Sequence, residues 1–182
     1  MYQASPEAYK LREIIEESKE PVLVMGIGVH GSGKSTILEQ AAWLGGPNQS
    51  AINVEAIRER FVRFRVGSHL AEYVDREVRR RVQNDLISHG VALIDSANIE
   101  GLRRTVDVAR YRKIGAATIG AIVMDAPHDA ARQMSGKQVT SLETEHFWQM
   151  QDSLQEQLPS HGEGFDWIMT VKPGEPITVS RV

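Results

Sequence analysis

The residues best suited to chemistry form a glycine-rich stretch, Gly28–Thr36, which reads GVHGSGKST. It satisfies the pattern G-x-x-x-x-G-K-[ST], whose glycines let backbone N–H groups turn around phosphate oxygens. Lys34 would reach the β- and γ-phosphates, and the Ser35 hydroxyl would hold Mg²⁺. We therefore predict a site for ATP and Mg²⁺ whose binding residues are Gly28, His30, Gly31, Ser32, Gly33, Lys34, Ser35 and Thr36. His30 is interpreted as a loop residue and not as a catalytic base.

A carboxylate and an arginine follow a short apolar segment near residue 52. Glu55 and Arg58 are three positions apart, so they share one face if this segment is helical. A carboxylate there can accept the proton of a hydroxyl group, and a guanidinium can bind an acceptor phosphate through two hydrogen bonds. An ordinary surface ion pair is the competing interpretation.

A third candidate is the acid that ends the apolar run Val91–Asp95. Asp95 is expected to bind Mg²⁺, through water, or to orient a neighbouring arginine. An acid at the end of a buried strand beside a phosphate-binding loop is more often functional than structural.

Apolar runs alternate with amphipathic segments along the chain, which predicts a parallel sheet covered by helices on both faces. We expect five strands, near residues 22–27, 51–53, 91–95, 117–124 and 165–171. Helices are expected near residues 6–18, 34–43, 54–61, 69–89, 101–114 and 141–157, and a short one from about Pro127. The prediction is one α/β domain over residues 1–182, with an N-terminal helix within 1–20, a small lid at about 128–140 and a tail, 172–182, that carries little signal. Ligands of such sheets bind at the carboxyl ends of the strands.

Composition restricts the other possibilities. The 182 residues include no cysteine, which excludes disulfides and thiolate chemistry. No apolar run reaches the roughly 20 residues of a membrane helix. The N-terminal segment is polar, so a soluble, cytoplasmic protein is expected, with no membrane partner. The net charge of −3 argues against general avidity for nucleic acid, although residues 58–113 are basic.

Four features taken together resemble the P-loop kinases typified by phage polynucleotide 5′-hydroxyl kinase. They are the loop Gly28–Thr36, Glu55-Ala56-Ile57-Arg58, Asp95-Ser96-Ala97-Asn98 followed by Arg103-Arg104, and Glu163-Gly164-Phe165-Asp166. The resemblance implies that Glu55 is the general base, that Arg58 meets an acceptor phosphate and that Asp95 supports the site. It also implies a lid arginine on the donor phosphates, with Arg132 as first candidate and Lys137 as second. The family usually has aspartate at the position of Glu55, and its lid is richer in arginine.

The acceptor stays open between three hypotheses. The first is a 5′-hydroxyl end of DNA or RNA, the second a small metabolite or nucleotide sugar, and the third a nucleotide-binding regulatory module with little turnover. Arginines and phenylalanines interleave after Glu55 and would either follow a nucleic acid strand or form an amphipathic helix with buried rings; they are Arg58, Arg60, Phe61, Arg63, Phe64 and Arg65. A second group of arginines is expected to be solvated helix surface: Arg76, Arg79, Arg80 and Arg81.

Overall fold

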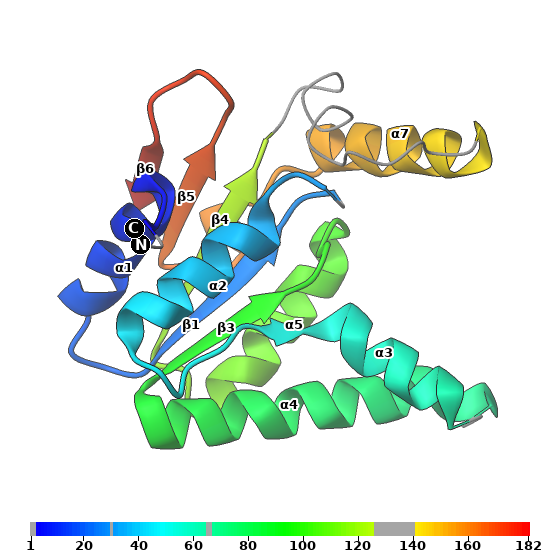
Figure 1. Ribbon diagram of the computed structural model, residues 1–182, viewed down its shortest axis with the longest axis horizontal. Coiled ribbons are helices and arrows are strands. Elements are labelled where there is room, and N and C mark those ends of the chain that lie inside the picture. The colour runs from blue at the N-terminus through cyan, green and yellow to red at the C-terminus, as the bar shows by residue number, and fades with distance from the viewer. Residues whose placement is uncertain (1–2, 30, 65–66, 126–140) are drawn as a thin grey trace.

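The computed structural model describes residues 3–29, 31–64, 67–125 and 141–182. Within these residues the chain forms an α/β fold with one six-stranded sheet in the order β2-β3-β1-β4-β5-β6 (Figure 1). The strands are β1 (Val22–Ile27), β2 (Ile52–Asn53), β3 (Val91–Asp95), β4 (Thr118–Met124), β5 (Trp167–Val171) and β6 (Thr178–Arg181). The helices are α1 (Pro6–Glu17), α2 (Lys34–Gly45), α3 (Val54–Arg63), α4 (Leu70–His89), α5 (Gly101–Lys113) and α7 (Ser141–Glu156), with single 3₁₀ turns at Gly67–His69 and His161–Glu163.

The sheet differs from the prediction at one edge. Strands β1 to β5 pair in parallel as expected, but a sixth strand, β6, pairs antiparallel with β5. The prediction of five strands was therefore wrong in number, and the segment 172–182 is not merely a tail. An edge strand buries few side chains. In β6 the one apolar side chain, Val179, is only partly buried, so the sequence carries little signal for this strand.

Two apolar clusters hold helices against the two faces of the sheet. One cluster joins α1 and α2 to the sheet through residues such as Leu11, Leu38 and Ile122. The other joins α4 and α5 to the opposite face through residues such as Val82 and Val108. The strands between them are buried on both sides, which is why β1 and β4 read as continuous apolar runs.

Local signals explain where several helices begin and end. The Ser5 side chain accepts a hydrogen bond from the Ala8 N–H, and Pro6 occupies the first turn of α1. Gly90, at φ 68°, ends α4 in the left-handed conformation that glycine adopts without steric cost. The helix expected from Pro127 and the lid at about 128–140 lie outside the described residues. No helix in the described part of the chain is long and apolar enough to cross a membrane.

Candidate phosphate-binding site

The glycine-rich loop connects β1 to α2 at the carboxyl edge of the sheet. Gly28, Gly31 and Gly33 have φ values of 147°, 78° and 90°, which side chains larger than hydrogen rarely tolerate. A Cβ atom on Gly28 would lie 3.0 Å from the Met124 Cβ and 3.2 Å from the Met124 carbonyl oxygen. The loop therefore requires glycine at this position both for its conformation and for its close approach to the end of β4.

Lys34 and Asp95 meet at the centre of this edge. The Lys34 ammonium is 3.4 Å from the Asp95 carboxylate, and the two side chains are only 5% and 7% exposed. They come together because β1 and β3 are neighbouring parallel strands, so that the loop after β1 and the last residue of β3 share one edge. Among the described residues, the cation that lies beside Asp95 is Lys34, and the expectation that Asp95 orients an arginine stays a prediction.

The loop also holds polar groups for which the described residues provide no hydrogen-bond partner. The Ser32 hydroxyl is buried, and its oxygen makes no hydrogen bond within the described residues. Leaving such a group unpaired costs about 1–3 kcal/mol, which a bound phosphate oxygen would offset. No side chain of the described residues caps α2 at Gly33, so the N–H groups of its first turn are available to an anion. This arrangement fits the phosphates of a nucleotide.

The residues also fit Mg²⁺ bound together with a nucleotide. The described part of the chain contains no group of three His, Cys, Asp or Glu side chains that could hold a metal by themselves. Mg²⁺ in nucleotide sites commonly uses one or two protein oxygens and takes its other ligands from phosphates and water. The exposed Ser35 hydroxyl and the Asp95 carboxylate are the candidate protein ligands.

The acceptor-side residues are connected to this site through Asn53. Its side-chain oxygen accepts a hydrogen bond of 2.8 Å from the Ala56 N–H and so caps α3, while its side-chain amide donates to Asp95 at 3.5 Å. Glu55 lies in the first turn of α3, and its carboxylate is 3.7 Å from the guanidinium of Arg58, with both side chains about half exposed. The start of α3 is therefore fixed next to Asp95.

The two phenylalanines near the end of α3 differ, and each fits one of the two interpretations. Ile57 is buried, and Phe61 packs against the core cluster, with its ring centroid 5.9 Å from that of Tyr73. Phe64, by contrast, is 71% exposed. The amphipathic helix was thus predicted correctly for Phe61, while Phe64 remains available to a ligand.

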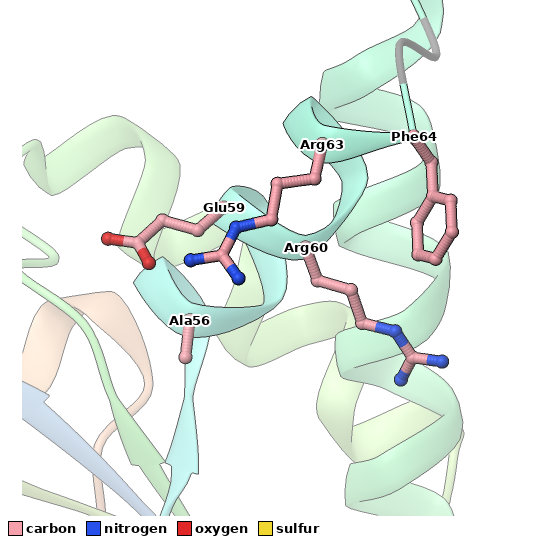
Figure 2. Close-up of a pocket in the computed structure, with 5 residues that line it drawn as sticks. All are labelled: Ala56, Glu59, Arg60, Arg63 and Phe64. Atoms are coloured by element: carbon pink, nitrogen blue, oxygen red, sulfur yellow. The ribbon is translucent and has the colours of Figure 1, made fainter.

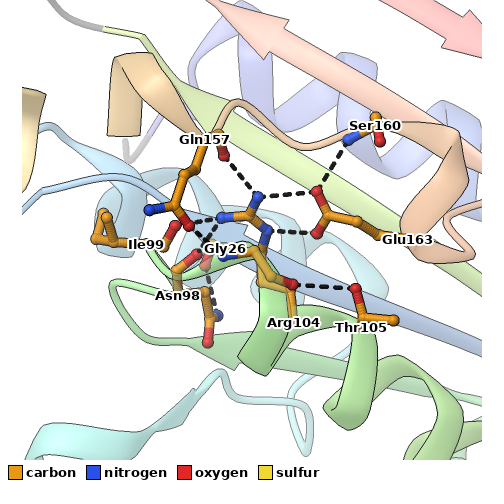
Figure 3. A network of polar contacts seen from close by, with 9 residues as sticks. Gly26, Asn98, Ile99, Arg104, Thr105, Gln157, Ser160 and Glu163 are labelled. Carbon is orange, nitrogen blue, oxygen red and sulfur yellow. Dashed lines mark hydrogen bonds and ion pairs between the residues drawn. The ribbon is translucent and has the colours of Figure 1, made fainter. Parts of the chain in front are cut away.

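The loop after Asp95 is held by a buried ion pair (Figure 3). Arg104 is 1% exposed and donates to both carboxylate oxygens of Glu163, at 2.6 and 2.9 Å. The same guanidinium donates to the carbonyl oxygens of Asn98 at 3.0 Å, Gln157 at 2.6 Å and Ile99. Two of the motifs that carried the family resemblance are therefore joined by direct contact.

That loop in turn supports the phosphate-binding loop. The Asn98 side-chain amide donates to the Gly26 carbonyl at 2.7 Å, and the Gly28 N–H donates to the Ala97 carbonyl at 3.0 Å. Asn98 has a positive φ of 48°, which asparagine tolerates better than most residues. Arg104 is thus a positioning residue that acts on the loop through Asn98.

Sequence reasoning missed one buried acid at the same edge. Asp125 directly follows β4, is 9% exposed, and is bound by Lys172 at 2.9 Å and by the Gln155 amide at 2.5 Å. Its hydrogen bond and negative charge raise the pKa of Lys172 above its ordinary value. Asp125 ends an apolar run in the same way as Asp95, and that shared pattern was the available signal.

The structure thus brings Lys34 and Asp95 together. Asn53 lies beside Asp95, and Glu55 follows Asn53 by two residues in the chain. Four residues of the prediction lie outside the described part of the chain, namely His30, Arg65, Arg132 and the second lid candidate, Lys137. The second group of arginines, on α4, forms ion pairs with acids of the same helix, as expected for solvated surface.

Fold and loop together define an α/β protein with a mostly parallel sheet and a glycine-rich loop after its first strand. One solved structure to which the chain is similar comes from work on the PezAT chromosomal toxin–antitoxin system of Streptococcus pneumoniae. The TM-score is 0.51 at 15% sequence identity, and the match covers 98% of this chain and 81% of the other. At this identity the likeness shows the fold alone. No family model matches the sequence, and no curated protein matches it.

Proposed function

We propose that this protein is an ATP-dependent kinase that phosphorylates a hydroxyl group, with the 5′-hydroxyl end of a polynucleotide as acceptor. The observation that carries the proposal is the buried Lys34–Asp95 pair on a loop with an unpartnered buried hydroxyl, Ser32. A purely structural glycine turn would have no need for a buried ammonium group or an unpaired hydroxyl.

On the donor side, Lys34 and the loop N–H groups hold the β- and γ-phosphates of ATP. Ser35 and Asp95 would hold Mg²⁺, which supplies charge neutralisation at the transferring phosphoryl group. Binding of phosphate requires the Lys34 ammonium to share its charge between Asp95 and the phosphate oxygens. The lid arginine stays a prediction, with Arg132 as first candidate.

On the acceptor side, the Glu55 carboxylate takes the proton of the acceptor hydroxyl, whose oxygen then attacks the γ-phosphorus. The bond from that phosphorus to the β–γ bridging oxygen breaks, and ADP leaves with the electron pair. Arg58 binds a phosphate of the acceptor, since a guanidinium fork matches two phosphate oxygens. The connection from Asn53 to Asp95 supports this assignment, because it fixes the start of α3 beside the donor site.

A small metabolite or nucleotide sugar is the second candidate acceptor. The observation that favours it is the Glu55–Arg58 contact of 3.7 Å, which gives Arg58 a partner within the protein. An acceptor that presents no phosphate to Arg58 would leave this pair in place.

The test compares a nucleoside with its 3′-phosphate as acceptors in steady-state kinetics with ATP and Mg²⁺. The polynucleotide proposal expects phosphorylation of the 3′-phosphorylated nucleoside and little or none of the plain nucleoside. Arg58→Ala should remove this preference while leaving ATP affinity unchanged. Equal kcat/KM for the two nucleosides would overturn the polynucleotide acceptor, and turnover of sugars instead would favour the second candidate. If the protein neither hydrolyses ATP nor transfers its γ-phosphoryl group to any acceptor, the proposal of a kinase is overturned.

A further inference from the structure

The outward face of α3 carries a shallow pocket of about 340 Å³ lined by Ala56, Glu59, Arg60, Arg63 and Phe64 (Figure 2). These positions recur with the spacing of one helical face and are all exposed, whereas Ile57 is buried and Phe61 packs against the core. The face begins one residue after Glu55 and runs to the end of the helix.

The arginines of this face differ from those of the neighbouring helix. Arg60 and Arg63 are exposed, and their guanidinium groups make no hydrogen bond or ion pair within the described residues. On α4, by contrast, each arginine of the group at 76–81 is paired with an acid of its own helix at 2.8–2.9 Å. Unpaired guanidinium groups beside an exposed aromatic ring are the combination that binds a single nucleic acid strand, by phosphate contact and base stacking.

Resting on the proposed function, we propose that this face of α3 binds the single strand that leads away from the 5′-hydroxyl end. Arg60 and Arg63 contact its phosphates, and Phe64 stacks against a base. Glu59, the one acid of the pocket, forms no ion pair with either arginine and repels the strand.

The rise of helix α3 determines how many nucleotides a strand needs to extend from the reacting hydroxyl to Phe64. From Glu55 to Arg63 the helix rises about 12 Å, at about 1.5 Å per residue. Stacked nucleotides advance about 3.4 Å each along a strand, so Phe64 lies about three or four nucleotides from the reacting hydroxyl. The enzyme should therefore distinguish short oligonucleotides by length.

The experiment measures kcat/KM for single-stranded 5′-hydroxyl oligothymidylates of one to about eight nucleotides, each with a 3′-phosphate, with the wild type and four variants. The wild type should gain kcat/KM with length up to about four nucleotides and then level off. Phe64→Ala should lower kcat/KM for the longer strands by about 5- to 100-fold. The same variant should leave the 3′-phosphorylated nucleoside unaffected.

Charge is tested by salt dependence of binding to the longest strand. The double variant Arg60→Ala/Arg63→Ala should reduce the slope of log affinity against log salt by about 1.4, or about 0.7 for each lost phosphate contact. Glu59→Gln should tighten binding. Arg80→Ala is the matched control, because it removes the same charge from an exposed arginine that is paired with Glu77, and it should change neither measurement.

The outcomes separate this inference from the proposed function. Phosphorylation of the 3′-phosphorylated nucleoside without any gain from length would overturn the α3 strand site alone. A length gain that survives Phe64→Ala and the double arginine variant, or that Arg80→Ala abolishes equally, would also overturn it. Failure of every 5′-hydroxyl nucleotide acceptor would overturn the polynucleotide proposal, and this inference with it.

Discussion

Replacing Glu163 by alanine tests how much the buried ion pair contributes to the fold. In the wild type the Arg104 guanidinium, 1% exposed, is neutralised by this carboxylate through two hydrogen bonds of 2.6 and 2.9 Å. Glu163→Ala leaves a buried cation whose remaining partners are neutral carbonyl groups, including those of Asn98 and Gln157.

The expected loss follows from comparable buried pairs. Removing one partner of a buried ion pair typically costs 3–5 kcal/mol, because the other charge stays without compensation. The carbonyl groups and the 13% exposure of the Glu163 side chain reduce this cost, so we expect a loss of about 3 kcal/mol in the free energy of unfolding. For a protein of this size that corresponds to a Tm lower by about 6–12 °C.

The assay is urea unfolding with a thermal melt, and Glu17→Ala is the control. Glu17 also pairs with a distant arginine, Arg181, but the two side chains are 45% and 54% exposed. This control should lose less than about 1 kcal/mol. A loss below about 1 kcal/mol for Glu163→Ala, or equal losses for the two variants, would refute the argument that burial makes this pair important.

Three further predictions concern the site and the surface. Lys34→Ala should weaken ATP binding or reduce turnover by more than about tenfold because it removes the buried cation of the loop. An unchanged dissociation constant for ATP by calorimetry, together with an unchanged turnover rate, would reject this prediction. Glu55→Gln should lower turnover by roughly 10²–10⁴-fold with ATP affinity intact, and a loss below about threefold would exclude Glu55 as the base. Hydrogen bonds from Arg80 and Arg81 lower the pKa of Glu77 from 4.5 to about 2, so its stabilising effect is complete above pH 4.5 and disappears as pH falls towards 2. Glu77→Gln should therefore cost about 1 kcal/mol at pH 7 and nothing near pH 2, and a cost that does not depend on pH would contradict the assignment.

The sequence predicted the glycine-rich loop and its flanking strand and helix because local patterns specify them. A buried strand, a glycine loop and a helix follow one another directly from Val22 to Gly45, so no long-range information is needed. Asp95 could be predicted for a related reason, because the apolar run before it marks the end of a buried strand. Parallel pairing then places that end beside the loop.

Long-range partners were harder to predict. Arg104 was noted only as half of an arginine pair, although Val108 and Tyr111, four and seven positions later, are buried on the same side of α5. That spacing places Arg104 on the apolar face and signals a buried charge that needs a partner. Nothing local identifies Glu163 as that partner, because the contact depends on how the segment before β5 packs against α5.

Under the proposed function, the charges of the site explain why both substrates must be present before the chemistry begins. Among the described residues, two candidate cations are each paired with an acid that the reaction needs: Lys34 with Asp95 and Arg58 with Glu55. Donor phosphates that attract Lys34 release Asp95 for Mg²⁺, and an acceptor phosphate that attracts Arg58 releases Glu55 for the hydroxyl proton. An acceptor without a phosphate would leave Glu55 in contact with Arg58, so that the carboxylate is not free to meet the acceptor hydroxyl. Selectivity for a phosphorylated acceptor should therefore be visible in kcat as well as in KM, and Arg58→Ala should reduce the difference in both.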